Sequence, residues 1–239
     1  GAYPNTAIAI GKWFSPEERA RAQAWIWSAS RIGGALAPLL IVPLQQEFGW
    51  RISFMLLGCL GVVWAFIWWK FYQEPDIQGN NKPAINPAVA VPWREHLSNP
   101  DFWKLMVMYY CYACGVFFYI SWLPRYLQQG RGMDEKDIAW NASAPFILAA
   151  LGCLAGGYLS DWLVKKSGKE FGRKAVPVAG LSISGLALLA AANTNSDLLA
   201  VVFLTLGLAF MDVTAPVSWA IATDMGKSAK GAITGAMNM

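Results

Sequence analysis

Residues 109–127 read YYCYACGVFFYISWLPRYL, a run of nineteen residues whose only charge is Arg125. A helix that crosses the hydrocarbon core of a bilayer needs roughly 20 apolar residues, so this run fits a membrane better than the core of a small soluble domain. At least five comparable stretches occur elsewhere in the chain. The sequence therefore predicts an all-α bundle of helices that crosses a membrane several times.

The composition favours the same class of protein. Of the 239 residues, 56% are hydrophobic and 14% are charged, whereas soluble domains carry about 25% charged residues. Cys111 and Cys114 have the spacing of some metal and redox sites, but neither a second cysteine pair nor a nearby histidine completes such a site. We therefore expect no metal and no cofactor.

Six full membrane spans and two partial ones are expected along the chain. The full spans are Ala22–Leu44, Ile52–Phe71, Phe102–Leu127, Ile138–Leu163, Val176–Asn193 and Leu198–Thr223. A partial helix, Gly1–Phe14, precedes them, and another begins at about Gly231. Because the first residue is Gly and both ends lie within helices, we expect a fragment of a longer membrane protein.

The distribution of basic residues predicts the orientation. If the loop after the first partial helix is cytoplasmic, 14 of the 19 Lys and Arg residues lie on the cytoplasmic side. Four lie on the other side, Arg51, Arg125, Arg131 and Lys136, and Arg31 falls within a span. This asymmetry follows the positive-inside rule. It makes nucleic-acid binding unnecessary as an explanation of the net charge of +4 and predicts a multi-pass protein of the inner (plasma) membrane.

A polar segment divides the helices into two groups. Residues 73–101 contain five prolines and several asparagines, which is typical of a flexible linker. We therefore expect residues 1–72 to end one helical half, residues 73–101 to form a cytoplasmic linker, and residues 102–239 to form the second half. Within the linker, Trp93–Leu97 is predicted to form a short amphipathic turn.

Three segments resemble the anion:cation symporter family of the major facilitator superfamily. Its fourth and fifth helices and the start of its sixth are similar to residues 1–40, GAYPNTAIAIGKWFSPEERARAQAWIWSASRIGGALAPLL, and 49–54, GWRISF. The end of its seventh helix resembles Trp122–Leu127, WLPRYL. The end of the tenth and start of the eleventh resemble Ser218–Met239, SWAIATDMGKSAKGAITGAMNM. The resemblance implies a chain that runs from the late fourth helix to the early eleventh.

The resemblance also implies a gate. The stretch Gly157–Asp161, GYLSD, followed by basic residues, is similar to the superfamily signature between helices eight and nine, although Trp162 replaces the usual basic residue. An acid at a cytoplasmic helix end can pair with basic residues and hold one conformation closed. The alternative is a solvated loop that only obeys the positive-inside rule. The predicted gating residues are Glu18, Arg19, Asp161, Arg173 and Lys174.

Two charges inside the spans are candidate functional residues. Arg31 lies about nine residues into its span, and Asp212 about eleven residues from the cytoplasmic end of an antiparallel span, so both sit at a similar depth. A charge at that depth should face a cavity or a partner. Arg31 is predicted either to bind a substrate carboxylate through its planar fork or to pair structurally with a buried acid. Asp212 is predicted either to titrate or to pair with Arg31, and the alternative is an acid that only accepts hydrogen bonds from hydroxyls of neighbouring helices.

Further candidate substrate-binding residues are aromatic or polar. Tyr112, Tyr119 and Trp122 fall on one side of an ideal helix, and the resemblance implies that the position of Tyr112 faces the substrate. Trp219 shares a helix face with Asp212, and Asn5 is a candidate polar wall residue. The alternative for each aromatic ring is simple packing against lipid or neighbouring helices.

Three functions fit these patterns. The resemblance favours a carrier that moves an organic anion, notably a hexuronate, aldarate or aldonate, by proton symport with alternating access. A facilitator or exchanger without a proton step is the first alternative, and a transporter-like sensor is the second. The sequence offers no catalytic set for an enzyme. The expected partners are the anion, the proton and the lipid bilayer, with no nucleic acid, and we expect the full-length protein to be monomeric.

Overall fold

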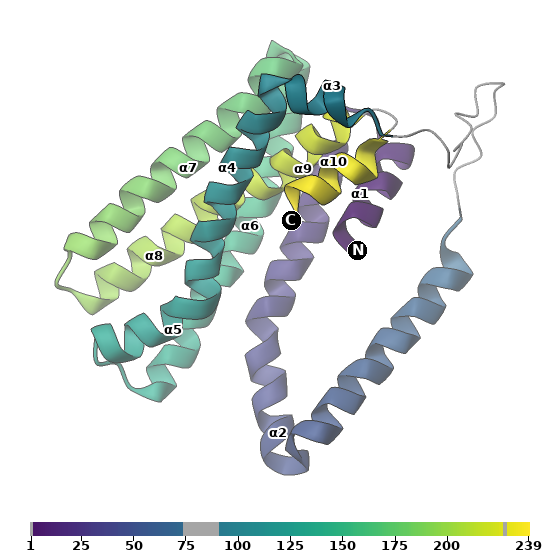
Figure 1. The fold of residues 1–239 in the computed structure, drawn as a ribbon. Helices are drawn as coiled ribbons and strands as arrows, with labels where there is room; N and C mark the ends of the chain where they lie inside the picture. The colour runs from purple at the N-terminus through teal and green to yellow at the C-terminus, as the bar shows by residue number, and fades with distance from the viewer. Residues whose placement is uncertain (1, 74–90, 227–228) are drawn as a thin grey trace. The chain divides into compact units, whose positions relative to one another are not determined.

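The structure, a computed structural model, describes residues 2–73, 91–226 and 229–239, and every regular element in these residues is a helix (Figure 1). The α-helices are α1 (Ala2–Trp13), α2 (Arg19–Phe71), α3 (Trp93–Ser98), α4 (Pro100–Phe117), α5 (Leu123–Arg125), α6 (Glu135–Ser167), α7 (Lys169–Asn193), α8 (Asp197–Asp212), α9 (Thr214–Met225) and α10 (Lys230–Met237). Two π-helical turns, η1 (Phe118–Trp122) and η2 (Tyr126–Gly130), flank α5. The all-α prediction is confirmed.

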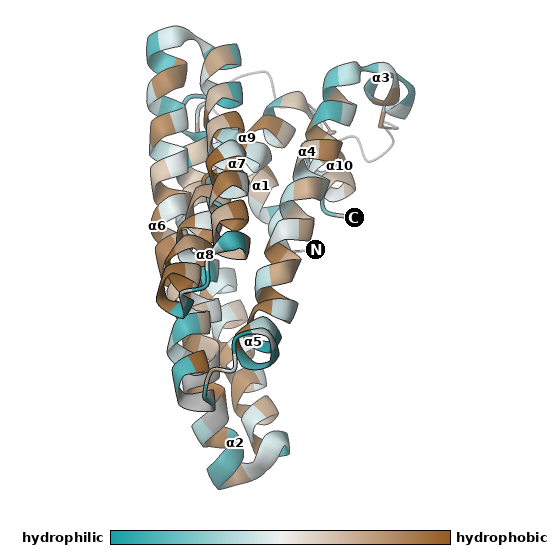
Figure 2. Ribbon diagram, turned by 90° about the vertical axis from the view of Figure 1, so that its left-hand side faces the viewer, coloured by the Kyte–Doolittle hydropathy of each residue, from teal (hydrophilic) through white to brown (hydrophobic). Residues whose placement is uncertain are grey.

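Five stretches of the described residues are long and apolar enough to cross a membrane. They are Pro43–Phe71, Pro100–Gly130, Trp140–Ser167, Lys169–Asn193 and Asp197–Met225. Much of their apolar surface is exposed, and hydrophobic turns run along α6, α7 and α8 in Figure 2. Because lipid is the natural contact for such a surface, the arrangement is that of a membrane bundle. The first predicted span, Ala22–Leu44, is helical as part of α2.

The chain divides into two compact units, one of residues Gly34–Ala90 and one of residues Gly1–Gly33 with Val91–Met239. In the first, α2 has a non-helical residue at Gly49, whose φ of 75° is readily adopted by glycine. This break lies between the predicted spans that end at Leu44 and begin at Ile52. Most of the linker predicted for residues 73–101 lies outside the described residues, and the short helix predicted at Trp93–Leu97 is α3. The three-part division of the chain stays a prediction.

The larger unit contains all the candidate functional residues. In it, α6, α7 and α8 pack against one another, and α1 contacts α9 and α10. Glycine allows the closest of these contacts, because a Cβ atom on Gly152 or Gly156 of α6 would collide with the carbonyl oxygen of Ala209 or Val213. We call the end of this unit at which α2 begins and α6 and α9 end the basic end.

Candidate functional site

The first four turns of α2 bury one face. Ala20, Ala24, Trp27 and Arg31 follow one another at intervals of three or four residues, and each is at most 7% exposed. Trp25, on the opposite face, is 59% exposed. This spacing is that of one helix face. The helix therefore carries a buried arginine toward the other helices while it turns an apolar tryptophan outward.

Asp212 lies at a break between helices α8 and α9. Pro216 has no backbone N–H, and in a continuous helix its ring would clash with the carbonyl of the residue four positions earlier, which is Asp212. The helix accordingly ends at Asp212 and resumes at Thr214. The sequence predicted a single span, Leu198–Thr223, across this point. The carboxylate is fully buried at the break.

Arg31, Tyr112 and Asp212 form what we call the central cluster. The guanidinium of Arg31 donates through Nε to Oδ2 of Asp212 and through Nη2 to Oδ1, the latter at 3.0 Å. The same Nη2 donates to the Tyr112 hydroxyl at 2.8 Å, and that hydroxyl donates to Oδ1 of Asp212 at 2.7 Å. Such bidentate, charge-assisted bonding offsets the cost of burying the two charges. The cluster joins α2, α4 and α8.

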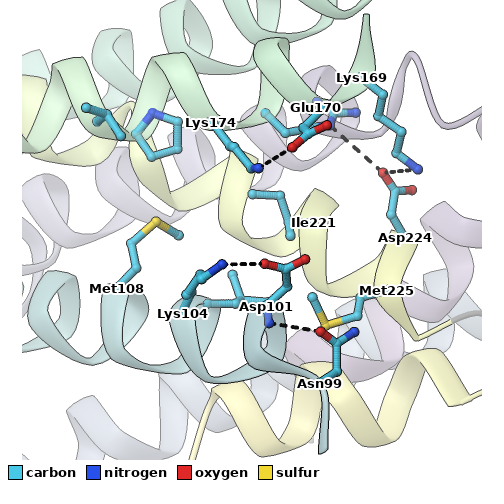
Figure 3. Close-up of a pocket in the computed structure, with 14 residues that line it drawn as sticks. Asn99, Asp101, Lys104, Met108, Lys169, Glu170, Lys174, Ile221, Asp224 and Met225 are labelled. Atoms are coloured by element: carbon cyan, nitrogen blue, oxygen red, sulfur yellow. Dashed lines mark hydrogen bonds and ion pairs between the residues drawn. The ribbon is translucent and has the colours of Figure 1, made fainter. Parts of the chain in front are cut away.

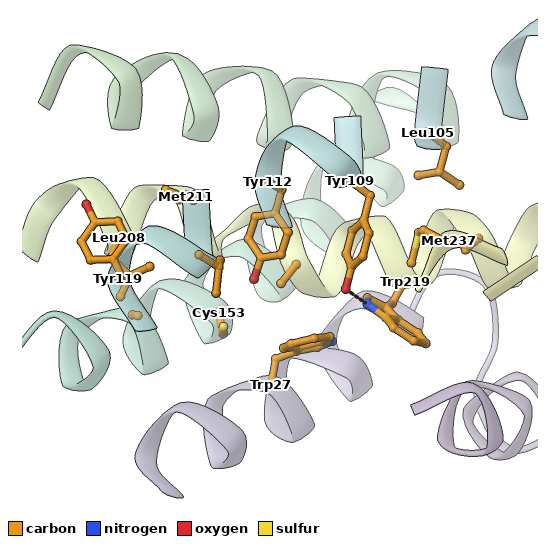
Figure 4. Close-up of a cluster of buried hydrophobic side chains, with 14 of the residues drawn as sticks. Trp27, Leu105, Tyr109, Tyr112, Tyr119, Cys153, Leu208, Met211, Trp219 and Met237 are labelled. Carbon is orange, nitrogen blue, oxygen red and sulfur yellow. Dashed lines mark hydrogen bonds between the residues drawn. The ribbon is translucent and has the colours of Figure 1, made fainter. Parts of the chain in front are cut away.

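Tyr3, Trp27, Tyr109 and Trp219 form what we call the aromatic layer. Figure 4 shows the last three of these side chains. The rings of Tyr3 and Trp27 stack with centroids 4.9 Å apart, and those of Trp27 and Trp219 lie 5.9 Å apart. The indole N–H of Trp219 donates to the Tyr109 hydroxyl at 3.1 Å. The Arg31 guanidinium lies 5.7 Å from the Trp27 ring, within cation–π range.

The aromatic layer lies on the basic-end side of the central cluster. Trp27 precedes Arg31 by one turn of α2, and Tyr109 precedes Tyr112 by three residues of α4. Both helices begin at the basic end, so both rings are displaced toward it. Trp219 is displaced the same way, because α9 ends there. Large rings thus fill the space between the buried ion pair and that end.

Arg19, Asp161, Lys169, Arg173 and Asp224 form a second group of charges, which we call the end cluster. Asp161 accepts from Nη1 of Arg173 at 2.8 Å. Its other oxygen accepts from a backbone N–H in the first turn of α2, at 2.7 Å. A carboxylate at a helix N-terminus is favoured by the free N–H groups and the helix dipole. Asp161 therefore ties α6 both to α7 and to the start of α2.

Asp224 is the second acid of the end cluster. It forms an ion pair with Arg19, another with Nζ of Lys169 at 3.0 Å, and a longer one with Nε of Arg173 at 3.9 Å. Its side chain is only 6% exposed. One carboxylate at the end of α9 thus faces basic side chains of both α2 and α7.

Lys230, at the start of α10, borders the end cluster. Its ammonium donates to the carbonyl of Gly11 at 3.0 Å, and Arg19 donates to the same oxygen at 3.4 Å. Burial lowers the pKa of Lys230, the Arg19 guanidinium lowers it further, and Asp224 acts in the opposite sense. The positive charges at the basic end are therefore crowded as well as paired.

The remaining predicted site residues lie in different environments, some buried and some on the surface. Trp219 belongs to the aromatic layer, and Tyr119 is buried with its hydroxyl donating to the carbonyl of Leu204 at 2.9 Å. Asn5 is exposed on α1. Glu18 pairs with Arg21 of the same segment, and Lys174 pairs with Glu170 on the surface. Asn5, Glu18 and Lys174 are therefore in neither the end cluster nor the central cluster.

Trp122 does not share a face with the two tyrosines, and this expectation from ideal helix spacing is corrected. Pro124 has no N–H, so the usual helical hydrogen bond from residue 124 to the carbonyl of Ile120 is missing. The N–H of Leu123 donates to the carbonyl of Phe118, five residues earlier, as in a π-helix. On an ideal helix Trp122, ten residues after Tyr112, lies about 80° away from it and is 58% exposed, whereas Leu123, eleven residues after Tyr112, lies about 20° away and is 1% exposed.

Sequence reasoning missed Asp224 and most of the aromatic layer. Asp224 lies one residue beyond the predicted span, within the segment that resembles the family. An acid in the last turn of a span, beside a basic loop, was the available signal. The described residues contain no group of three or more His, Cys, Asp or Glu that could hold a metal ion.

Long apolar helices with their ionisable side chains turned inward define a polytopic membrane protein of the bundle type. The family described as Major Facilitator Superfamily matches residues 1–239, and the chain belongs to it. This is a family of transporters, which agrees with the prediction that the chain is not an enzyme, and the resemblance drawn from the sequence is confirmed.

Several curated relatives align with most of the chain. A probable sulfoacetate transporter of Cupriavidus necator is 29% identical over 255 residues, which cover 100% of this chain and 58% of the relative. A hexuronate transporter of Bacillus subtilis is 29% identical over 224 residues, 90% of this chain and 53% of the relative. A D-galactonate transporter of Escherichia coli is 26% identical over 257 residues, 98% and 59% of the two chains. The chain thus spans little more than half the length of these relatives.

Proposed function

We propose that the full-length protein is a secondary active transporter of an organic anion, a sugar acid of the hexuronate, aldarate or aldonate class, in the inner membrane. Relatives named for hexuronate and D-galactonate transport support the substrate class. The observation that carries the proposal is the central cluster, in which a buried arginine is neutralised by a single acid. A guanidinium fork is also the group best suited to a substrate carboxylate.

The charge balance of this cluster supports proton symport as the mechanism. While Asp212 is ionised, it occupies the guanidinium of Arg31 with two hydrogen bonds. A substrate carboxylate that entered beside it would add an unbalanced negative charge in a low-dielectric site. Protonation of Asp212 removes that charge and leaves the guanidinium to the substrate. One proton would thus accompany each bound carboxylate, and Tyr112, which bonds to both residues, would remain as a donor.

Alternating access requires a gate, and the end cluster supplies candidates for it. Asp161 and Arg173, together with Arg19 through Asp224, link the start of α2 to α6, α7 and α9. These ion pairs would hold the basic end closed and would separate when that end opens. Glu18 and Lys174 lie at the same end in pairs of their own and would contribute only through the local field.

Uptake by the full-length protein in sealed vesicles tests the proposal. Labelled glucuronate, galactarate, galactonate and sulfoacetate are offered with and without an inward proton gradient. We expect one of the three sugar acids to accumulate only with the gradient, and Arg31→Gln to abolish the uptake. The matched control is Arg125→Gln, which removes an exposed arginine that stacks on Trp122.

The alternatives give different results in the same assay. A facilitator or exchanger would equilibrate the acid without responding to the gradient, because the carboxylate would displace an ionised Asp212 directly. A sensor would bind an acid without moving it. No binding and no uptake of any of the three sugar acids would refute the proposed substrate class, and so would uptake of sulfoacetate alone.

A further inference from the structure

A cavity of about 580 Å³ lies at the basic end between α4, α7 and α9 (Figure 3). This volume is within the range of about 300–1,000 Å³ that is usual for small-molecule sites. Its inner wall is formed by Leu105, Met108, Pro177, Val178, Ile221 and Met225. The cavity therefore offers an apolar surface large enough for part of an amphiphile.

Three lysines surround this apolar wall. Lys104 comes from α4, and Lys169 and Lys174 come from α7. Each has an acid partner, at 2.9 Å for Asp101 and Lys104, 3.0 Å for Asp224 and Lys169, and 2.5 Å for Glu170 and Lys174. In Figure 3 the pair of Lys104 and Asp101 lies on α4 and the pair of Lys174 and Glu170 lies on α7.

The lysines of two of the three pairs can bind another anion in place of their carboxylate at a small cost in free energy. The side chains of Lys104 and Asp101 are 74% and 58% exposed, and those of Lys174 and Glu170 are 62% and 83% exposed. Ion pairs this exposed contribute about 0–1 kcal/mol. A ligand anion that offers several oxygens at once can therefore replace either carboxylate.

The position of the lysines along the helices indicates the depth of the site. Lys104 and Lys174 lie in the first two turns of α4 and α7, two stretches able to cross a membrane. Lysines at that level are at the height of lipid headgroups. Val178, one turn further into α7, is 65% exposed, so the apolar wall continues toward the hydrocarbon region.

We propose that this cavity binds an anionic phospholipid, with the phosphate between Lys104 and Lys174 and the upper part of an acyl chain on the apolar wall. A free sugar acid would satisfy the lysines but leave that wall bare. An uncharged amphiphile would cover the wall but leave the lysines paired with Asp101 and Glu170, without contributing to their contacts. An anion with an attached acyl chain matches both parts of the site.

A bound lipid would also affect the ion pairs of the end cluster. The cavity is lined by Lys169, Arg173 and Asp224, which are members of that cluster. A phosphate near Lys169 competes with Asp224 for its ammonium, and Asp224 then depends more on Arg19. The site therefore couples the composition of the bilayer to the ion pairs at the basic end, whatever substrate the protein carries.

The test measures lipid binding by the full-length protein in detergent, with phosphatidylglycerol, phosphatidylcholine and inorganic phosphate as separate probes. Bound lipid is counted by mass spectrometry of the intact protein. We expect phosphatidylglycerol to be retained, and the double variant Lys104→Gln/Lys174→Gln to weaken its binding by about tenfold or more. The matched control, Lys165→Gln/Lys166→Gln, removes two exposed lysines at the end of α6 that do not line the cavity, and should leave binding within about twofold.

Val178→Asn provides a second variant that keeps all the charges and lowers only the acyl-chain contact. It should weaken phosphatidylglycerol binding without affecting any response to inorganic phosphate. Equal retention of phosphatidylcholine, competition by inorganic phosphate alone, or equal effects of the two lysine pairs would each overturn the proposal. So would a full-length protein that retains no lipid.

Discussion

The central cluster and the end cluster both join α2 to helices of the C-terminal part of the chain, yet they are built differently. The central cluster has one buried base and one buried acid, which bond to each other and to the same tyrosine hydroxyl. The end cluster has three bases and two acids at helix ends, with exposure from 5% at Arg173 to 53% at Lys169. As proposed above, the central cluster would change state with a single proton, whereas the end cluster can lose one contact and keep others.

The number of partners, more than burial, sets the expected energies. Removing one partner of a buried ion pair costs about 3–5 kcal/mol, because the remaining charge is left without compensation. The two acids of the end cluster are also buried, at 6% and 7%, but Lys169 is exposed, and Asp161 keeps Arg173 when Asp224 is lost. We therefore expect the central cluster to respond to single substitutions far more strongly than the end cluster.

The largest effect is expected for Arg31→Gln. It leaves the Asp212 carboxylate buried without its cation, so uptake should fall to background and stability should drop by about 3–5 kcal/mol. Thermal unfolding of the purified full-length protein measures the second effect. A stability within 1 kcal/mol of wild type, by the order-of-magnitude cost above, would show that the pair is not buried in the full-length protein.

The double variant Arg31→Gln/Asp212→Asn separates stability from transport. It removes both charges together, so most of the lost stability should return. Transport should remain absent, because the carboxylate-binding fork is gone. Recovery of uptake in the double variant would exclude Arg31 as the group that binds the substrate.

Asp212→Asn should have the next largest effect. The amide cannot titrate, but its oxygen can still accept from Arg31, so substrate binding should persist while accumulation driven by a proton gradient is lost. Binding followed by tryptophan fluorescence, with Trp27 close to Arg31, and uptake across a pH gradient measure the two properties. Gradient-driven uptake equal to wild type would rule out Asp212 as the proton-coupling group.

The sequence was sufficient for the central cluster because helix rise is regular. Counting residues from the ends of two antiparallel spans placed Arg31 and Asp212 at one depth, and the structure pairs them. The prediction for Trp122 was wrong because ten residues after Tyr112 is about 80° away on an ideal helix, at the edge of the buried face.

The end cluster and the aromatic layer were harder to predict for other reasons. Asp224 lies one residue beyond the predicted span, and its partners lie more than 50 residues away in sequence. Trp27 is one of 13 tryptophans, and a tryptophan that faces lipid has the same local sequence as one that is buried. Only the packing of distant helices distinguishes Trp27 from the exposed Trp25.

A smaller effect is expected for Asp224→Asn. The contacts of Asp161 with Arg173 and with the start of α2 remain, so the basic end should open more often without losing its fold. Each 1 kcal/mol lost from the closed state raises the open population about fivefold. Alkylation of Cys153, which is fully buried in the same hydrophobic cluster as Tyr112, reports this opening once the other three cysteines are replaced by serine.

Glu170→Gln is the control for this experiment. It makes the same change of charge at the same end of the molecule, but in an exposed pair with Lys174. We expect alkylation of Cys153 to remain at the wild-type rate. Equal acceleration by the two variants would mean that only the net charge of the basic end matters, and not the ion pairs of Asp224.

The smallest effect is expected for Trp219→Phe in the aromatic layer. The substitution keeps an aromatic ring against Trp27 but removes the indole N–H that donates to Tyr109. The loss should be about 0.5–1.5 kcal/mol of stability, with proton coupling unchanged, because the central cluster is untouched. Combining it with Tyr109→Phe tests the assignment, since the double variant should cost less than the sum of the single ones. Additive losses would show that the two side chains pack as independent rings, and that the layer stabilises the protein through its apolar surface alone.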